Sequence, residues 1–120
     1  MSILLNAFSA NMLAGFPCSV TFTEINAETA RINLMCAAEE EGDAEFIRSA
    51  VGHADTAAVF ADVLGIPVEC RRVNVTLAPG DDAILGQYIG PRLPEGCRTL
   101  PEGAAIKWLY VSVAGATAAK

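Results

Sequence analysis

One histidine, His53, stands in the run VGHADT at 51–56. Histidine titrates at about pH 6.5 in model peptides, so it can give or take a proton near neutral pH. Gly52 permits close approach of a ligand to the backbone. The free N–H groups of a following helix would face a bound anion, and Asp55 and Thr56 add oxygens there. We therefore predict a polar ligand site around His53, outside the core, although a lone histidine more often caps a helix or sits on the surface.

A second candidate group lies in the run GPRLPEG at 90–96, where Arg92 and Glu95 are three positions apart among prolines and glycines. Arginine binds phosphate oxygens through paired hydrogen bonds, which lysine cannot match. Taken alone, the pair is more often a surface salt bridge in an exposed loop, and such a bridge adds little stability.

Uncharged hydrogen-bonding residues follow the expected end of the first strand at Asn6, and they include Ser9 and Asn11. Loops after strands are a common place for ligand contacts, although turn formation and helix capping explain such residues equally well. On a later strand, Arg72 could reach a phosphate, whereas Arg71 is typical of a solvent face.

The composition restricts the class of protein. The chain has 120 residues, of which 52% are hydrophobic and 18% charged, and this favours one folded domain. The formal charge of −6 argues against long nucleic acid as a partner, because such a partner requires a basic face. A small anionic ligand needs only a few local donors.

Cysteine usage and the N-terminus favour a cytoplasmic protein without a metal. The four cysteines form no CxxC pair, and one histidine makes a structural zinc site improbable. The N-terminus lacks the basic region of a signal peptide, so a disulfide framework is not expected. No apolar run reaches the roughly 20 residues that a membrane helix needs.

The hydrophobic pattern predicts five or six strands and two helices. Asn26 is an N-cap for a helix that ends near Gly42, and Gly65 ends a second helix that begins after His53. Alternation predicts strands at 2–8, 18–25, 70–78, 83–89 and 105–113, with 70–78 and 83–89 forming a hairpin around APGDD and 90–103 forming an ordered loop.

The order of these elements predicts the α+β class. Helices and strands do not alternate strictly, so we expect a central, mostly antiparallel or mixed sheet flanked by helices. One domain would span 1–113, and a flexible tail would span 114–120.

Three ordered stretches together resemble the viral ring nucleases, the type III anti-CRISPR family. They are NAFSxNML at 6–13, VGHxxT at 51–56, and RLPEG at 92–96 before Leu100. Each stretch is unspecific alone, but the ordered set is fairly specific. The resemblance runs from about residue 3 to residue 103.

The resemblance implies a small homodimer that binds cyclic tetra-adenylate, the messenger that activates type III CRISPR defence nucleases, across its interface. The family cuts this ring into linear di-adenylates and needs no metal or other cofactor. On this sequence, the resemblance assigns catalysis to His53, Arg92 and Glu95. It assigns substrate binding to Asn6, Ser9, Asn11, Gly52, Thr56 and Arg72.

Three features depart from the family pattern. Asp55 adds a negative charge beside the expected phosphate site, Gln87 does not align clearly, and the acidic stretch 36–45 is long. Two other classes of function stay open: a protein that binds cyclic oligoadenylate without cutting it, as a sponge or sensor, and a regulator that binds protein partners through an apolar patch. The sequence leaves a viral or cellular origin open as well.

Overall fold

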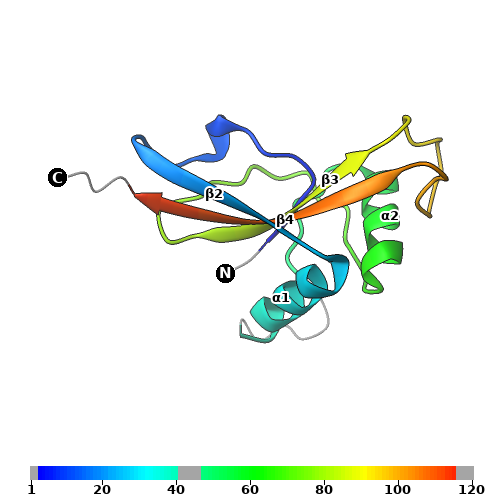
Figure 1. The fold of residues 1–120 in the computed structure, drawn as a ribbon, viewed down its shortest axis with the longest axis horizontal. Coiled ribbons are helices and arrows are strands. Elements are labelled where there is room, and N and C mark those ends of the chain that lie inside the picture. The colour runs from blue at the N-terminus through cyan, green and yellow to red at the C-terminus, as the bar shows by residue number, and fades with distance from the viewer. Residues whose placement is uncertain (1–2, 41–46, 116–120) are drawn as a thin grey trace.

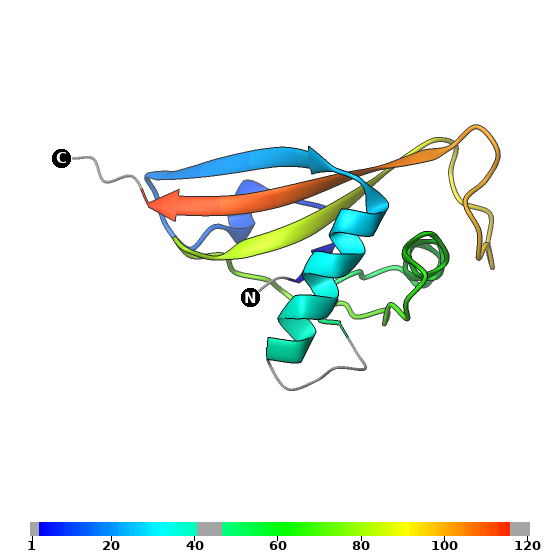
Figure 2. The same cartoon turned by 60° about the horizontal axis from the view of Figure 1, so that its bottom comes forward.

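A four-stranded mixed sheet with both helices on one face forms the frame of the protein (Figures 1 and 2). The computed structural model describes residues 3–40 and 47–115. The predicted α+β class, with helices flanking a mixed sheet in one domain, is confirmed. The elements in chain order are β1 (Leu4–Leu5), the short 3₁₀ helix η1 (Ala10–Met12), β2 (Cys18–Ile25), α1 (Ala27–Glu40), α2 (Ala54–Leu64), β3 (Asp82–Ile89) and β4 (Ala105–Gly115).

Both helices begin, and α2 ends, where the sequence predicts. The Oδ1 atom of Asn26 accepts a hydrogen bond of 2.7 Å from the N–H of Thr29, which makes it the N-cap of α1. Gly65 follows α2 with φ of 73°, a left-handed conformation that suits glycine. The predicted end of α1 near Gly42 lies outside the described residues.

β4 is the central strand of the long antiparallel part of the sheet. It pairs along β2 on one side and along β3 on the other, and β1 adds a short parallel pairing to β3, giving the order β1-β3-β4-β2. β4 extends to Gly115, two residues beyond the predicted strand, and the remainder of the predicted tail lies outside the described residues.

The predicted strand at 70–78 and its hairpin with 83–89 are wrong, and four strands are described rather than five or six. Residues 70–77 form an extended segment that makes single bridges to Val51 and Leu13. β3 pairs with β4 along its length and with β1 at Ile84 and Leu85, and the 70–77 segment is not one of its partners. The apolar alternation arises because Val75 packs on the core and Leu77 is buried. The first strand is also shorter than predicted, at Leu4–Leu5.

One cluster of buried apolar side chains packs on each face of the sheet. On the helix side, the ring of Phe60 in α2 packs in a tilted arrangement against Trp108 of β4, with 5.0 Å between the ring centroids. On the opposite side, residues such as Leu85 and Val111 are covered by Phe8, Met12 and Val75, which come from the loop after β1 and from the 70–77 segment. The two faces therefore present different loops to solvent. Within the described chain, neither helix has the length and apolar character needed to span a membrane.

Candidate functional site

His53 is the N-cap residue of α2 and is exposed to solvent. Its Nδ1 atom accepts a hydrogen bond of 3.4 Å from the N–H of Thr56. The histidine therefore lies outside the core, and it also performs the capping role that local sequence pattern favours. The ring can donate through Nε2 while this cap is intact, because Nδ1 then uses its lone pair as an acceptor.

The β3–β4 loop, residues 90–104, extends past the end of the sheet and lies beside α2 (Figures 1 and 2). A cavity of about 490 Å³ lies between them, lined by His53, Asp55, Arg92, Leu93, Pro94 and Glu95. An adjoining cavity of about 270 Å³ is lined by His53, Thr56, Tyr88, Gly90, Arg92 and Leu93. The three residues predicted to be catalytic thus surround one cavity, although they come from distant parts of the sequence.

Several contacts fix the position of this loop. At its start, the hydroxyl of Tyr88 donates a hydrogen bond of 2.6 Å to the carbonyl of Pro91. Gly90 packs so closely that a Cβ atom there would lie 2.7 Å from Cβ of Ala104. Near its middle, the N–H of Gly96 donates to Oδ2 of Asp55 at 3.3 Å, which joins the loop to α2.

Gly52 and Arg72, both predicted to bind substrate, line neither of the two cavities at His53. A guanidinium nitrogen of Arg72, Nη2, donates to the carbonyl of Gly52 at 3.3 Å, directly before His53. A Cβ atom on Gly52 would meet Arg72 atoms at 3.6 Å, an ordinary contact distance. Nothing in the described chain therefore requires glycine at this position, and its predicted role in ligand approach stays a prediction.

Asn6, Ser9 and Asn11 line a different cavity, of about 500 Å³, on the loop after β1. Phe8 holds this loop through an edge-to-face contact with Phe22, at 5.4 Å between ring centroids. Backbone bonds join the loop to the 70–77 segment, because Leu77 donates to the carbonyl of Met12. The predicted substrate-binding residues are thus divided between two places.

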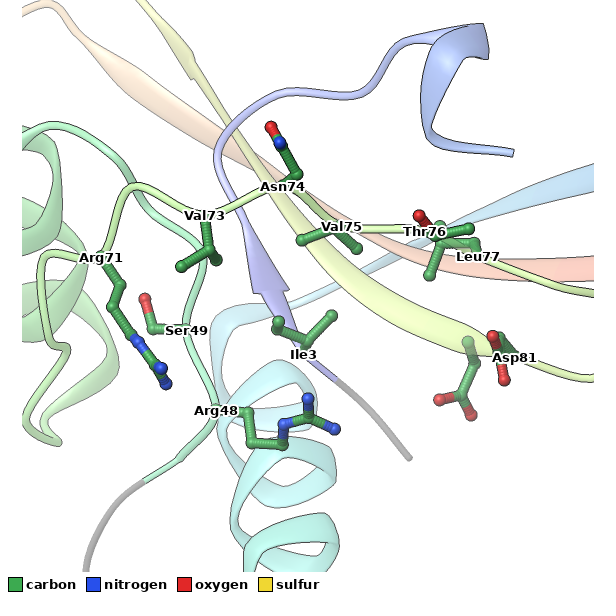
Figure 3. Close-up of a pocket in the computed structure, with 11 residues that line it drawn as sticks. Ile3, Arg48, Ser49, Arg71, Val73, Asn74, Val75, Thr76, Leu77 and Asp81 are labelled. Carbon is green, nitrogen blue, oxygen red and sulfur yellow. The ribbon is translucent and has the colours of Figure 1, made fainter. Parts of the chain in front are cut away.

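A fourth cavity, of about 420 Å³, lies on the other side of the 70–77 segment and is lined by none of the predicted site residues (Figure 3). Three of its polar side chains form hydrogen bonds within the chain. Ser49 donates to the carbonyl of Glu69, Asp81 accepts from the N–H of Ala78, and Asp82 accepts from a tyrosine hydroxyl. These three bonds stabilise turns and strands.

The charge around His53 is mixed. Arg92 brings one positive charge to the cavity, and Asp55 and Glu95 bring two negative charges. Cation, imidazole and carboxylate together are suited to binding a phosphate and moving a proton to or from it. Among residues 3–40 and 47–115, no group of three or more histidine, cysteine, aspartate or glutamate side chains is placed to hold a metal ion.

One pKa shift concerns the sheet rather than the cavity. The hydroxyl of Tyr110 donates a hydrogen bond of 2.9 Å to Oδ2 of Asp82. This hydrogen bond, together with burial and the negative charge of the carboxylate, raises the pKa of Tyr110 above its usual value of 10.0. The pair joins β3 to β4 at the opposite end of β3 from the β3–β4 loop.

Tyr88 and Asn74 are among the lining residues that were not identified from the sequence. Tyr88 lies at the end of β3, one residue after Gln87, and the alternation of a strand turns them to opposite faces. Gln87 accordingly lines an apolar hollow with Phe8 and Phe22, away from His53. Asn74 lines the cavity of Asn6, and it points away from Ser49 in Figure 3. The misassigned strand at 70–78 concealed its role as a lining residue.

Comparison with known proteins identifies the family. The model of the STIV B116-like family matches residues 2–103. Among solved structures, the chain is similar to B116 of Sulfolobus turreted icosahedral virus, with 29% sequence identity and a TM-score of 0.74 over 92% of this chain and 97% of that chain. No curated protein sequence matches the chain. The matched range agrees with the stretch over which the sequence resembles a viral protein family. The protein belongs to the STIV B116-like family.

Proposed function

We propose that this protein is a metal-independent ring nuclease that cuts cyclic tetra-adenylate into linear di-adenylates ending in a 2′,3′-cyclic phosphate. The observation that supports this function is the convergence of His53, Arg92 and Glu95 on one cavity, from a helix N-terminus and a distant loop. These side chains supply a proton donor, a phosphate-binding cation and an orienting carboxylate. In the cytoplasm of a host cell, such cleavage would remove the messenger and end type III CRISPR signalling.

The ring supplies its own nucleophile in this mechanism. A ribose 2′-hydroxyl oxygen attacks the adjacent phosphorus, so an O2′–P bond forms and the P–O5′ bond breaks. The hydroxyl proton passes to water, and protonated His53 gives a proton to the departing O5′. Acid assistance of this kind contributes about 10²–10⁴-fold. The protein mainly provides geometry, because the reacting groups already belong to one molecule.

Arg92 and Glu95 have different roles in this step: Arg92 acts on the phosphate, and Glu95 acts on the imidazole. Arg92 stabilises the negative charge that develops on the phosphate oxygens, where its fork of N–H donors fits two oxygens at once. Glu95 accepts a hydrogen bond from the imidazole and orients it. Protonation of Nδ1 requires release of the cap bond to Thr56, and its length of 3.4 Å makes that release inexpensive.

The substrate is bound between two copies of the chain. One chain carries a single histidine, whereas two di-adenylate products require two cuts in the ring. A homodimer with the ring at its interface provides two His53 side chains. The separate cavity at Asn6, Ser9 and Asn11 offers further hydrogen bonds to the ring.

A second candidate function is a sponge or sensor that binds the ring and leaves it intact. The cap bond favours this alternative, because a histidine whose Nδ1 caps a helix is neutral and is a weaker acid than imidazolium. Turnover separates the two functions, since a sponge returns the ring unchanged.

The test compares matched variants on cyclic tetra-adenylate in EDTA, with products separated by chromatography and binding measured by calorimetry. Arg92→Ala should lower the cleavage rate by about 10²–10³-fold, whereas Arg98→Ala, in the same loop, should not. Glu95→Gln should also lower the cleavage rate, whereas its control, Glu102→Gln, should not. A ring with 2′-deoxyadenosine should bind and remain uncut. Binding of the natural ring without cleavage would support the sponge or sensor. The absence of both binding and cleavage would refute both functions.

A further inference from the structure

Asp55 joins the two parts of the candidate site. It is the second residue of α2, two positions after His53, and its side chain is half-buried. Its Oδ2 atom accepts the hydrogen bond from the N–H of Gly96, although the two residues are far apart in sequence. Asp55 also lines the cavity of about 490 Å³ together with Glu95. The carboxylate is therefore placed to act on the loop as well as on a ligand.

The N–H of Gly96 that donates to Asp55 belongs to a tight turn that also contains Glu95. The N–H of Cys97 donates to the carbonyl of Pro94 at 3.0 Å, which closes a four-residue turn. Gly96 is its third residue and has φ of 79°, the conformation that a type II turn requires there. The N–H bonded to Asp55 belongs to the peptide that links Glu95 to Gly96. This hydrogen bond consequently fixes the central peptide of the turn and the direction of Glu95.

The hydrogen bond to Gly96 gives a reason for the charge of Asp55 in a cavity that already contains Arg92 and Glu95. An unengaged carboxylate near a phosphate would weaken anion binding through repulsion. The oxygen of Asp55 instead bonds an amide, and its charge lies in the first turn of α2, where the helix dipole favours an anion. Repulsion of a phosphate alone does not account for the contact of Asp55 with the loop.

We infer that Asp55 is a positioning residue that holds the Glu95 turn, and with it the β3–β4 loop, against the N-terminus of α2. The loop then presents Arg92 and Glu95 toward His53 before any ligand binds. The effect on turnover rests on the proposed ring nuclease function, whereas the effect on the loop does not. The two effects are therefore measured separately.

The loop is tested without substrate, by amide hydrogen exchange of Gly96 measured by NMR on the full chain. Asp55→Ala removes the acceptor and should speed this exchange about fivefold relative to wild type, as expected for losing one partly exposed hydrogen bond. Asp55→Asn keeps an oxygen acceptor and should restore most of the protection. Asp62→Ala, which removes an exposed carboxylate of the same helix, is the matched control and should leave Gly96 unchanged. Equal exchange of Gly96 in Asp55→Ala and Asp62→Ala would overturn the inference.

Turnover is then measured with saturating cyclic tetra-adenylate at a temperature at which circular dichroism shows every variant to be folded. Asp55→Ala should lower kcat about fivefold to tenfold, in step with the loosened loop, while Asp55→Asn recovers most of it. A general loss of stability would not distinguish the two substitutions in this way. Unchanged kcat in Asp55→Ala, with an active wild type, would overturn the positioning role. If wild type cuts no ring, the proposed function fails, and the exchange result alone decides whether Asp55 holds the loop.

Discussion

Replacement of Gly86 by alanine tests how closely α2 packs on the sheet. Gly86 is a buried residue of β3 and pairs with Trp108 of β4. A Cβ atom there would lie 2.6 Å from Cζ3 of Trp108 and 2.8 Å from Cε2 of Phe60. Both rings are almost fully buried, with 4% and 1% of their residue surfaces exposed, so neither can swing into solvent. Since Phe60 belongs to α2, the added methyl group must push this helix away from the sheet.

The expected loss of stability follows from two opposing effects. Overpacking of a core costs about 1–3 kcal/mol, and the reduced freedom of the unfolded chain returns about 0.4–1 kcal/mol. The midpoints of these ranges leave a net loss of about 1.3 kcal/mol, which lowers Tm by about 5 °C for a chain of this size. Ring cleavage should fall as well, because a shift of α2 moves His53 away from the β3–β4 loop.

Urea unfolding followed by far-UV circular dichroism measures the effect. Gly15→Ala is the matched control, because a Cβ atom at Gly15 meets nothing within 4 Å. In the Gly86→Ala background, Phe60→Leu should destabilise the protein less than it does in wild type, since the smaller side chain makes room for the methyl group. Equal stability of Gly86→Ala and Gly15→Ala would show that α2 does not press on this glycine.

Three further predictions concern the site and the sheet. Tyr88→Phe removes the hydrogen bond to Pro91 and should lower the free energy of unfolding in urea by less than about 1 kcal/mol. Ring cleavage should nevertheless fall several-fold, because this bond fixes the start of the β3–β4 loop. Unchanged cleavage would contradict this role of Tyr88. Gly52→Ala should leave Tm unchanged and weaken ring binding in calorimetry, and equal affinity would remove Gly52 from the substrate site. The raised pKa of Tyr110 implies that its bond to Asp82 stabilises the fold fully below about pH 10, the ordinary tyrosine pKa, and that this contribution declines as pH rises through the higher pKa of the folded state. Unfolding of wild type and Tyr110→Phe between pH 8 and 11 measures this, and an advantage of wild type that grows with pH would contradict it.

Local signals in the sequence predicted the helices and the long strands well. The N-cap at Asn26 and the stop at Gly65 each depend on neighbouring residues, so they can be predicted without a tertiary structure. The strand at 18–25 was also found with its bounds.

The strand predicted at 70–78 was wrong because a segment that is buried on one side shows the same apolar alternation as a strand, even when it lies outside the sheet. Val75 and Leu77 alternate with polar residues because one side of the 70–77 segment covers the second apolar cluster, not because it belongs to the sheet. Sequence alternation reports which side is buried, and it cannot report whether a neighbouring strand has a free edge.

The local sequence predicted a polar site at His53, whereas the grouping of His53 with Arg92 and Glu95 was predicted from a resemblance. No local rule brings Arg92 to His53, because their approach depends on the long β3 and β4 strands that carry the loop past α2. The link between Asp55 and Gly96 is a tertiary contact of the same kind. The sequence alone presented Asp55 as an unexplained charge for this reason.

The most direct test of the central claim is incubation of the purified protein with labelled cyclic tetra-adenylate in EDTA, followed by chromatography and mass spectrometry of the products. The account predicts linear di-adenylate with a 2′,3′-cyclic phosphate from wild type, and a loss of about 10²-fold or more in rate for His53→Ala. An intact ring after prolonged incubation with folded wild-type protein, or equal rates for wild type and His53→Ala, would contradict it.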